Sequence, residues 1–244
     1  MAVAGCHTGG GAERYGKTYY LDGAGNWGWG TSGVVEGLRQ AGYPGDVEPF
    51  PWTTSLVPLL DQVNPIGAKL RAGSLADKIA QYRKEYPNTQ VNLIGLSAGT
   101  GVAVWTAERL PDEVKIDNVI LLGASMSHKY DVSEALKHMR GKIYVYYSPN
   151  DGFLAPVKLL GTVDGKYGVS SAGQVGLAAP PGMEHRVVNI GWSPEWVKYG
   201  WTGGHLECAQ PEFVRTQIVR HVMDRPPVGD SFVGFVEPAR PKPN

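Results

Sequence analysis

The stretch "VNLIGLSAGTG", residues 91–101, carries the strongest structural signal in this chain. It places Gly95-x-Ser97-x-Gly99 between an apolar, strand-like run and a helical run. Side chains two residues before and after such a serine would collide with the neighbouring strand and helix, so both positions stay small. The turn lifts the serine hydroxyl clear of the sheet, and the start of the helix offers the N–H of Ala98 to an oxyanion. The stretch predicts a nucleophilic serine, with a purely structural strand-to-helix turn as the alternative.

Strand-like runs and amphipathic helical runs alternate on both sides of this stretch. Such alternation predicts a three-layer α/β/α sandwich around a mostly parallel sheet of about six strands. We expect the strands at Thr18–Leu21, around Val47–Phe50, and at Val91–Leu96, Val119–Leu122, Ile143–Tyr147 and Val187–Ile190. We expect a first helix after an N-cap at Thr31 or Ser32, and a second from a Ser74/Asp77 capping box to about Glu85. A third covers Thr100–Leu110, and a fourth runs from an Asp131/Glu134 capping box to Gly141. The last helix begins at Pro211 and buries Phe213, Val214, Ile218 and Val222.

The length of the chain indicates one domain, and its charge argues against some classes of partner. The 244 residues suffice for one α/β domain, which we place at residues 17–225, between a flexible N-terminal segment, 1–16, and an extended Pro-rich tail, 226–244. Lys plus Arg and Asp plus Glu number 23 each, and no dense basic run is present to neutralise phosphates. Nucleic acid and acidic membrane surfaces are therefore not expected as partners. The oligomeric state is left open.

The N-terminus contains a short match to a lipid-attachment signal. Val3-Ala4-Gly5-Cys6 resembles the lipobox of bacterial lipoproteins, although the positive and apolar regions of a signal peptide are missing. No apolar run approaches the roughly 18 residues of a membrane span. We therefore expect membrane attachment, in a bacterial cell envelope, only if Cys6 is lipidated, and otherwise a cytoplasmic protein. Cys208 is the only other cysteine, which leaves a Cys6–Cys208 disulfide open.

A serine nucleophile needs a general base, and the base needs an orienting carboxylate. In the strand-turn-helix architecture these partners follow along the chain in the order acid, then histidine. Asp151, in "KIYVYYSPNDGF", follows the end of a strand, at the edge where parallel sheets build their sites, and Asp164 is a weaker rival. His205, in "GWTGGHLE", follows the last strand and precedes the final helix, where none of the other five histidines lies. The sequence thus predicts a triad of Ser97, Asp151 and His205.

With these residues placed, the chain resembles the α/β-hydrolase superfamily over roughly residues 17–223. The residues around Ser97 are similar to its nucleophile elbow, Asp151 to its acid and His205 to its base. The two leading strands of the superfamily are missing, as in small lidless esterases, lipases and cutinases. The resemblance implies a minimal α/β-hydrolase core and a serine esterase that acts on small-molecule or polymeric carboxylic esters, without a cofactor.

The resemblance also implies an open site. Many members insert a lid in the region between Ser125 and Lys142, and the span in this chain is too short for a large cap. His128 and Asp131 are spaced like a metal-ligand pair, but two ligands without a third are a weak signal, so we expect no metal.

In the superfamily, the loop after the first strand of such a core supplies a second oxyanion N–H. Here "DGAGN", residues 22–26, occupies that place, with Ala24 as the first choice of donor and Gly25 as the second. Large aromatic side chains flank this loop and the loop before the histidine. Among them are Trp27, Trp29 and Trp201. We expect these side chains to contact an acyl chain or an aromatic polyester unit, and the alternative is that they only pack the loops against the core.

Two other functions compete with ester hydrolysis. The pattern Gly23-x-Gly25-x-x-Gly28 after a strand fits the phosphate-binding turn of a nucleotide-binding Rossmann protein, with Glu48 on the ribose. That function requires the third glycine to open a helix, whereas the helix signals begin around Ser32. A non-catalytic binding protein with an α/β-hydrolase-like fold would keep the sheet without a working base.

Overall fold

Six parallel strands form a single sheet in the computed structural model, which describes residues 11–53 and 65–223. Their spatial order is β2-β1-β3-β4-β5-β6, and each neighbouring pair is parallel. Each strand begins and ends within about one residue of the bounds expected from its apolar run, so the predicted sheet is confirmed. The strands are β1 (Lys17–Leu21), β2 (Asp46–Pro49), β3 (Val91–Leu96), β4 (Val119–Leu122), β5 (Ile143–Tyr147) and β6 (Val187–Gly191).

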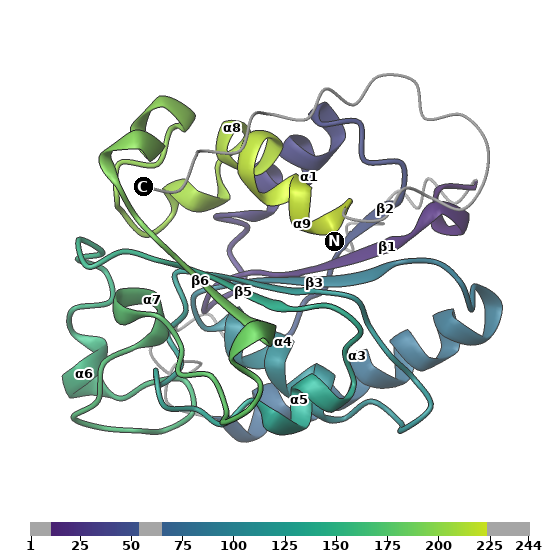
Figure 1. Cartoon of the computed structure of the whole chain (residues 1–244), viewed down its shortest axis with the longest axis horizontal. Helices are drawn as coiled ribbons and strands as arrows, with labels where there is room; N and C mark the ends of the chain where they lie inside the picture. Colours follow the sequence, from purple (N-terminus) through teal and green to yellow (C-terminus); the bar gives the residue numbers. More distant parts are fainter. Residues whose placement is uncertain (1–10, 54–64, 224–244) are drawn as a thin grey trace, which may run out of the picture.

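Helices cover both faces of the sheet, as Figure 1 shows, which is the expected three-layer arrangement. One face carries α1 (Thr31–Gln40) and a continuous C-terminal run of α8 (Pro211–Phe213), the π-helical η5 (Val214–Ile218) and α9 (Val219–Val222). The other face carries α3 (Pro65–Glu85), α4 (Gly99–Glu108) and α5 (Ser133–Lys137). The shorter elements are α6 (Val157–Leu160), α7 (Ala172–Val175), and the 3-10 helices η1 (Ala12–Tyr15), η2 (Glu184–Arg186), η3 (Pro194–Tyr199) and η4 (Glu207–Ala209).

Each face of the sheet has its own apolar core, because successive strand residues point to opposite faces. In β3, Leu93 packs in the cluster beneath α3 and α4, whereas Ile94 packs in the cluster beneath α1 and the C-terminal helices. All six residues of β3 are buried. A strand covered on both sides reads as a nearly continuous apolar run, which is why the sequence identified it.

The strand order creates a crevice between β1 and β3. The chain leaves β1 toward α1 on one face, and it leaves the neighbouring β3 toward α4 on the opposite face. The loops after these two strands therefore diverge at the carboxyl edge of the sheet. In open parallel sheets this is where ligands bind. The fold thus places the loop after β1 and the Gly95-Leu96-Ser97-Ala98-Gly99 turn side by side.

Three of the expected helix starts were wrong. α3 spans Pro65–Glu85, so Ser74 lies inside it and donates a hydrogen bond to the Leu70 carbonyl instead of capping an end. The buried face of its first half consists of alanines, Ala68 and Ala72, which give little apolar periodicity. The N-cap of α1 is Gly30, one residue before the earlier of the two expected positions.

The third wrong start concerns α5. This helix spans Ser133–Lys137, and the Asp131 carboxylate accepts hydrogen bonds from the Ser133 N–H and hydroxyl. The aspartate therefore forms a local turn two residues before the helix begins. The helix also ends before Gly141, where we had expected its C-terminus. The last helical run does begin at Pro211, and its four expected core residues are buried.

The described residues include part of the N-terminal segment. Ala12–Tyr15 form η1, which the sequence did not predict, and the Glu13 carbonyl accepts a hydrogen bond from the Tyr82 hydroxyl. Cys6, with its lipobox-like neighbours, and the Pro-rich tail, 226–244, lie outside the described residues. Among the helices that are described, none combines the length and apolarity needed to cross a bilayer.

The contact between α1 and the C-terminal helices gives a stability prediction. A Cβ at Gly37 would lie 2.6 Å from Val214 Cβ and 2.8 Å from the Pro211 carbonyl oxygen. We expect Gly37→Ala to destabilise the protein by about 1–3 kcal/mol despite the better helix propensity of alanine, because the two elements must separate. Urea denaturation measures the change. Gly67→Ala on α3 is the matched control, because a Cβ there meets nothing within 4 Å, and it should stabilise by up to about 1 kcal/mol. Equal effects of the two substitutions would contradict the packing argument.

His221 on α9 gives the folded protein a specific acid sensitivity. Its ring stacks on Tyr144 with centroids 3.7 Å apart, and its Nε2 is 2.9 Å from the Tyr146 hydroxyl. Burial, and then the neighbouring Arg220, lower the pKa of His221 from 6.5 to about 3. The folded state therefore keeps this imidazole neutral where the unfolded chain protonates it.

This difference predicts how stability changes with pH. Between about pH 6.5 and pH 3 the unfolded chain binds a proton at His221 that the folded chain does not bind. The free energy of unfolding should fall as the pH falls through this window, by up to about 1.4 kcal/mol per pH unit from this group. Urea denaturation across the window, compared with His221→Gln, isolates the contribution. The variant should lose stability less steeply than the wild type, and parallel curves would refute the assignment.

Candidate active site

Ser97 occupies a tight left-handed turn between β3 and α4. Its φ is 52°, a conformation that costs a non-glycine residue free energy. A Cβ at Gly95 would lie 2.8 Å from the Gly99 carbonyl oxygen, and one at Gly99 would lie 2.3 Å from the Leu21 carbonyl oxygen. Both flanking positions therefore require glycine for the steric reason expected from the sequence.

The carboxylate and imidazole expected to support this serine lie together. Asp151 follows β5, His205 precedes η4, and Asp151 Oδ2 is 2.7 Å from His205 Nδ1. The side chains of both residues are buried, with 2% and 7% of each residue exposed. Asp151 Oδ1 accepts hydrogen bonds from the N–H groups of Phe153 and Leu154. The carboxylate is thus held in one orientation by backbone donors on one oxygen and by the imidazole on the other.

Gly123, directly after β4, makes room for this pair. Its φ is +50°, and a Cβ there would lie 3.0 Å from His205 Nδ1 and 3.4 Å from Asp151 Oδ2. Sequence reasoning missed this residue, because its role depends on two side chains from distant loops. The rival acid Asp164 has another task, since its Oδ1 accepts a hydrogen bond from the Ser127 N–H.

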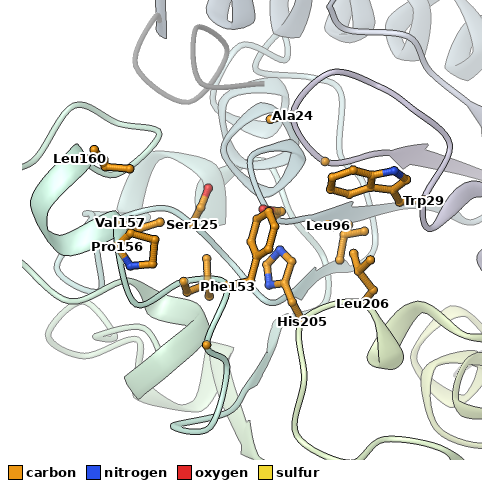
Figure 2. Close-up of a pocket in the computed structure, with 14 residues that line it drawn as sticks. Ala24, Trp29, Leu96, Ser125, Phe153, Pro156, Val157, Leu160, His205 and Leu206 are labelled. Atoms are coloured by element: carbon orange, nitrogen blue, oxygen red, sulfur yellow. The ribbon is translucent and has the colours of Figure 1, made fainter. Parts of the chain in front are cut away.

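One cavity of about 410 Å³ joins the serine and the histidine. Its lining is mainly apolar, with hydroxyl groups from Ser97 and Ser125 and the His205 imidazole as the polar side chains. Figure 2 shows the lining side chains around the open space. The residues that complete the lining are Gly23, Ala24, Trp29, Leu96, Gly152, Phe153, Leu154, Pro156, Val157, Leu160 and Leu206.

The loop after β1 approaches Ser97 from the neighbouring strand. A Cβ at Gly23 would lie 3.5 Å from Ser97 Cβ, and Ala24 lines the cavity, whereas Gly25 does not. Among the described residues, neither the Ala24 nor the Ala98 N–H donates a backbone hydrogen bond. Of the two donors expected from the sequence for this loop, Ala24 is thus the one that reaches the cavity.

The buried Asp22 side chain holds the same loop through hydrogen bonds to its backbone. Its carboxylate accepts hydrogen bonds from the Tyr20 hydroxyl at 2.9 Å, from the Gly28 N–H at 2.6 Å and from the Gly30 N–H at 3.2 Å. Burial, together with this carboxylate, raises the pKa of Tyr20 well above its usual value, which keeps the phenol protonated as a donor. A fixed negative charge thus occupies N–H groups that a phosphate would need in a nucleotide-binding turn.

The helix after this loop also argues against nucleotide binding. α1 begins at Thr31, so Gly28 does not open it. Glu48, expected on the ribose in that interpretation, forms ion pairs with Lys17 and Lys78. The arrangement of this loop is therefore that of a positioned backbone turn beside Ser97.

No family model and no curated protein sequence matches this chain. Among solved structures, Aspergillus fumigatus lipase B matches with a TM-score of 0.52 and 12% identity, over 88% of this chain and 54% of that one. A cutinase-like protein from Cryptococcus sp. matches with a TM-score of 0.43 and 13% identity, over 85% and 93% of the two chains. Trichoderma reesei cutinase matches with a TM-score of 0.37 and 20% identity, over 53% of this chain and 59% of that one.

The chain has an α/β-hydrolase-like fold. This chain spans just over half of the length of lipase B. At these identities the likeness concerns the fold alone. Within the α/β-hydrolase-like fold, β1 to β6 form the minimal core expected from the sequence.

The three tryptophans expected at the site have different places in this α/β-hydrolase-like fold. Trp29 lines the cavity. Trp27 lies in an adjacent hollow and contacts the ring of Trp29 edge-on, with the two ring centroids 5.1 Å apart. The expectation was wrong for Trp201, which is 1% exposed and does not line the cavity. Its indole packs edge-on against Phe213, and its Nε1 donates a hydrogen bond to the Gly204 carbonyl, so it fixes the loop that carries the histidine.

Sequence reasoning missed the wall that follows the acid. Phe153 stacks on the His205 ring, with centroids 4.5 Å apart and planes inclined by 13°, although 55% of it is exposed (Figure 2). The next apolar residues, up to Leu160 on α6, continue this wall. The only available signal was the apolar run "FLAPV" directly after Asp151-Gly152. Across residues 11–53 and 65–223 no group of three metal-binding side chains occurs.

The role of Asp22 can be tested by stability. In Asp22→Asn one carboxylate oxygen becomes an NH₂ group that faces N–H donors, so we expect destabilisation by about 2–3 kcal/mol in urea denaturation. Asp131→Asn is the control, because within the described chain one oxygen of that exposed carboxylate accepts both bonds, from Ser133, and an amide oxygen can still accept them. It should cost under about 0.5 kcal/mol. A loss no greater than that of the control would show that the loop does not depend on the charge.

Proposed function

We propose that this protein is a serine hydrolase that cleaves carboxylic esters. The observation that carries the proposal is that Ser97, in its left-handed turn, and His205, paired at 2.7 Å with the buried Asp151, line the same apolar cavity. Nucleophile, base and orienting acid follow in the chain order of this architecture. Candidate oxyanion donors come from two separate loops on the same side.

The geometry supports a two-step mechanism. The His205 Nδ1–H donates to Asp151, which leaves Nε2 unprotonated, and this buried nitrogen has no protein partner within the described part of the chain. Nε2 takes the proton of the Ser97 hydroxyl as Oγ attacks the ester carbonyl. The Ala98 and Ala24 N–H groups stabilise the resulting oxyanion.

Collapse of this intermediate breaks the ester bond. His205 gives the proton to the departing alcohol, and an acyl group remains on Ser97. A water molecule then attacks the acyl-enzyme while His205 again accepts a proton. The second intermediate releases the carboxylic acid, and the proton returns to Ser97. The net reaction converts one ester and one water molecule into one alcohol and one carboxylic acid.

The cavity favours an apolar acyl group. Its walls at Leu154, Val157 and Leu160 bear no charge, and a charged chain would be desolvated there without a partner. Trp29 and Phe153 stand partly exposed at the edge, where flat rings can contact a chain or a polymer unit. Lipase B, which has a similar fold, bears a name consistent with ester chemistry.

Labelling of the nucleophile tests the proposal. A fluorophosphonate probe should label the wild-type protein and fail to label Ser97→Ala, and kcat/KM for nitrophenyl butyrate should fall at least about 10³-fold in that variant. Ser74→Ala, an exposed serine on α3, is the matched control and should behave like the wild type. A folded wild-type protein that takes no label would instead be a non-catalytic binding protein. Equal labelling of Ser97→Ala would place the nucleophile elsewhere.

A further inference from the structure

Within the described residues, two polar side-chain atoms on the cavity wall are buried without a hydrogen-bond partner. One is His205 Nε2, whose role as the base accounts for it, and the other is Ser125 Oγ. Ser125 is 0% exposed. Buried hydroxyl groups in folded proteins are nearly always hydrogen-bonded, so an unpartnered hydroxyl that faces a ligand cavity requires an explanation.

The backbone of Ser125 is fixed beside the nucleophile. Its N–H donates to the Ser97 carbonyl at 3.3 Å, and its own carbonyl accepts from the Val163 N–H at 3.2 Å. Both backbone groups are therefore engaged, and the hydroxyl is the remaining polar group of this residue. Figure 2 shows the Ser125 side chain between His205 and the wall formed by Val157 and Leu160.

The Ser125 hydroxyl is a polar group on an otherwise apolar stretch of the cavity wall. The neighbouring wall consists of Leu154, Pro156, Val157 and Leu160, none of which has a polar side-chain atom. An alanine at position 125 would fit an apolar wall without burying an unpaired hydroxyl. A polar group on an otherwise apolar wall of a cavity orients a ligand and discriminates between ligands that can and cannot reach it.

We propose that Ser125 is a specificity-determining residue whose hydroxyl donates a hydrogen bond to an oxygen atom along the acyl chain. The favoured substrates are then esters of acids that carry an ether, hydroxyl or further ester oxygen on an otherwise apolar chain. This inference rests on the proposed ester hydrolysis and identifies its substrate class. The bond forms only with bound substrate, so the free protein tolerates an unpaired buried hydroxyl for the sake of selectivity.

Oxygen-substituted substrates test the assignment. The probes are p-nitrophenyl hexanoate and three analogues in which an ether oxygen replaces the methylene at position 3, 4 or 5. For each enzyme the ratio of kcat/KM for the analogue to that for the hexanoate is measured. Comparing this ratio between wild type and Ser125→Ala cancels the intrinsic reactivity of each ester. We expect at least one analogue to lose about 2- to 13-fold in the variant, the factor for one net hydrogen bond.

Two further variants separate the hydrogen bond from a structural effect. Ser127→Ala is the matched control, because Ser127 is also buried, its Oγ accepts from the Lys129 N–H, and it does not line the cavity. It should leave all three ratios unchanged and lower the Tm. Ser125→Ala should leave the Tm unchanged or raise it, because the hydroxyl has no hydrogen bond to lose within the described residues. Ser125→Cys, a similar side chain with a weaker donor, should give intermediate ratios.

The possible outcomes distinguish this inference from the proposed function. If Ser125→Ala changes kcat/KM for all four esters by the same factor, the hydroxyl holds a water molecule or supports the site, and the selectivity proposal is overturned. A lowered Tm in Ser125→Ala would also overturn it, because the hydroxyl would then have a partner within the protein. If the wild type takes no fluorophosphonate label, the hydrolase proposal itself has failed. Labelling of Ser97 with unaltered ratios refutes only the role of Ser125.

Discussion

The close approach of α4 to the end of β1 is the constraint on which the rest of the site depends. A Cβ at Gly99 would lie 2.3 Å from the Leu21 carbonyl oxygen, so only glycine lets the first turn of α4 reach this place. That contact fixes where α4 begins, and with it the left-handed turn that holds Ser97 at a φ of 52°. It also brings Gly23, in the loop after β1, against the Ser97 side chain. The position of the serine and that of its candidate oxyanion loop thus follow from one packing contact.

Several arrangements around this contact cost stability. Ser97 has a positive φ, the Asp151 carboxylate is buried, and two polar atoms on the cavity wall, on Ser125 and His205, have no partner in the described chain. Strained or unpaired groups persist only where many surrounding contacts hold them in place, and they concentrate where they serve a function. Here the surroundings are a strand buried on both faces and a carboxylate held by two backbone N–H groups and an imidazole. The concentration of such groups in one cavity supports its assignment as the reactive site.

The glycine-rich loop after β1 illustrates a limit of local patterns. Its glycine spacing fits a nucleotide-binding turn as well as an oxyanion loop, and within the sequence only the late helix signals, around Ser32, argued against nucleotide binding. The Asp22 carboxylate also argues against nucleotide binding, because it accepts hydrogen bonds from Gly28 and Gly30 and places a negative charge where a phosphate would bind. These bonds depend on the left-handed backbone of Asn26 and Gly28, which lies beyond what residue spacing encodes.

The sequence by itself determined the six parallel strands, the turn around Ser97 and the chain order of serine, aspartate and histidine. These features are local: a doubly covered strand is a continuous apolar run, and a sharp turn requires small neighbours within five residues. Only the tertiary structure decided the start of α3, whose first half buries the alanines Ala68 and Ala72, the burial of Trp201 and the places of Gly123 and Ser125. Each of these depends on side chains that arrive from distant loops. Contacts of this kind are set by how the loops pack across the edge of the sheet, which no periodicity along the chain records.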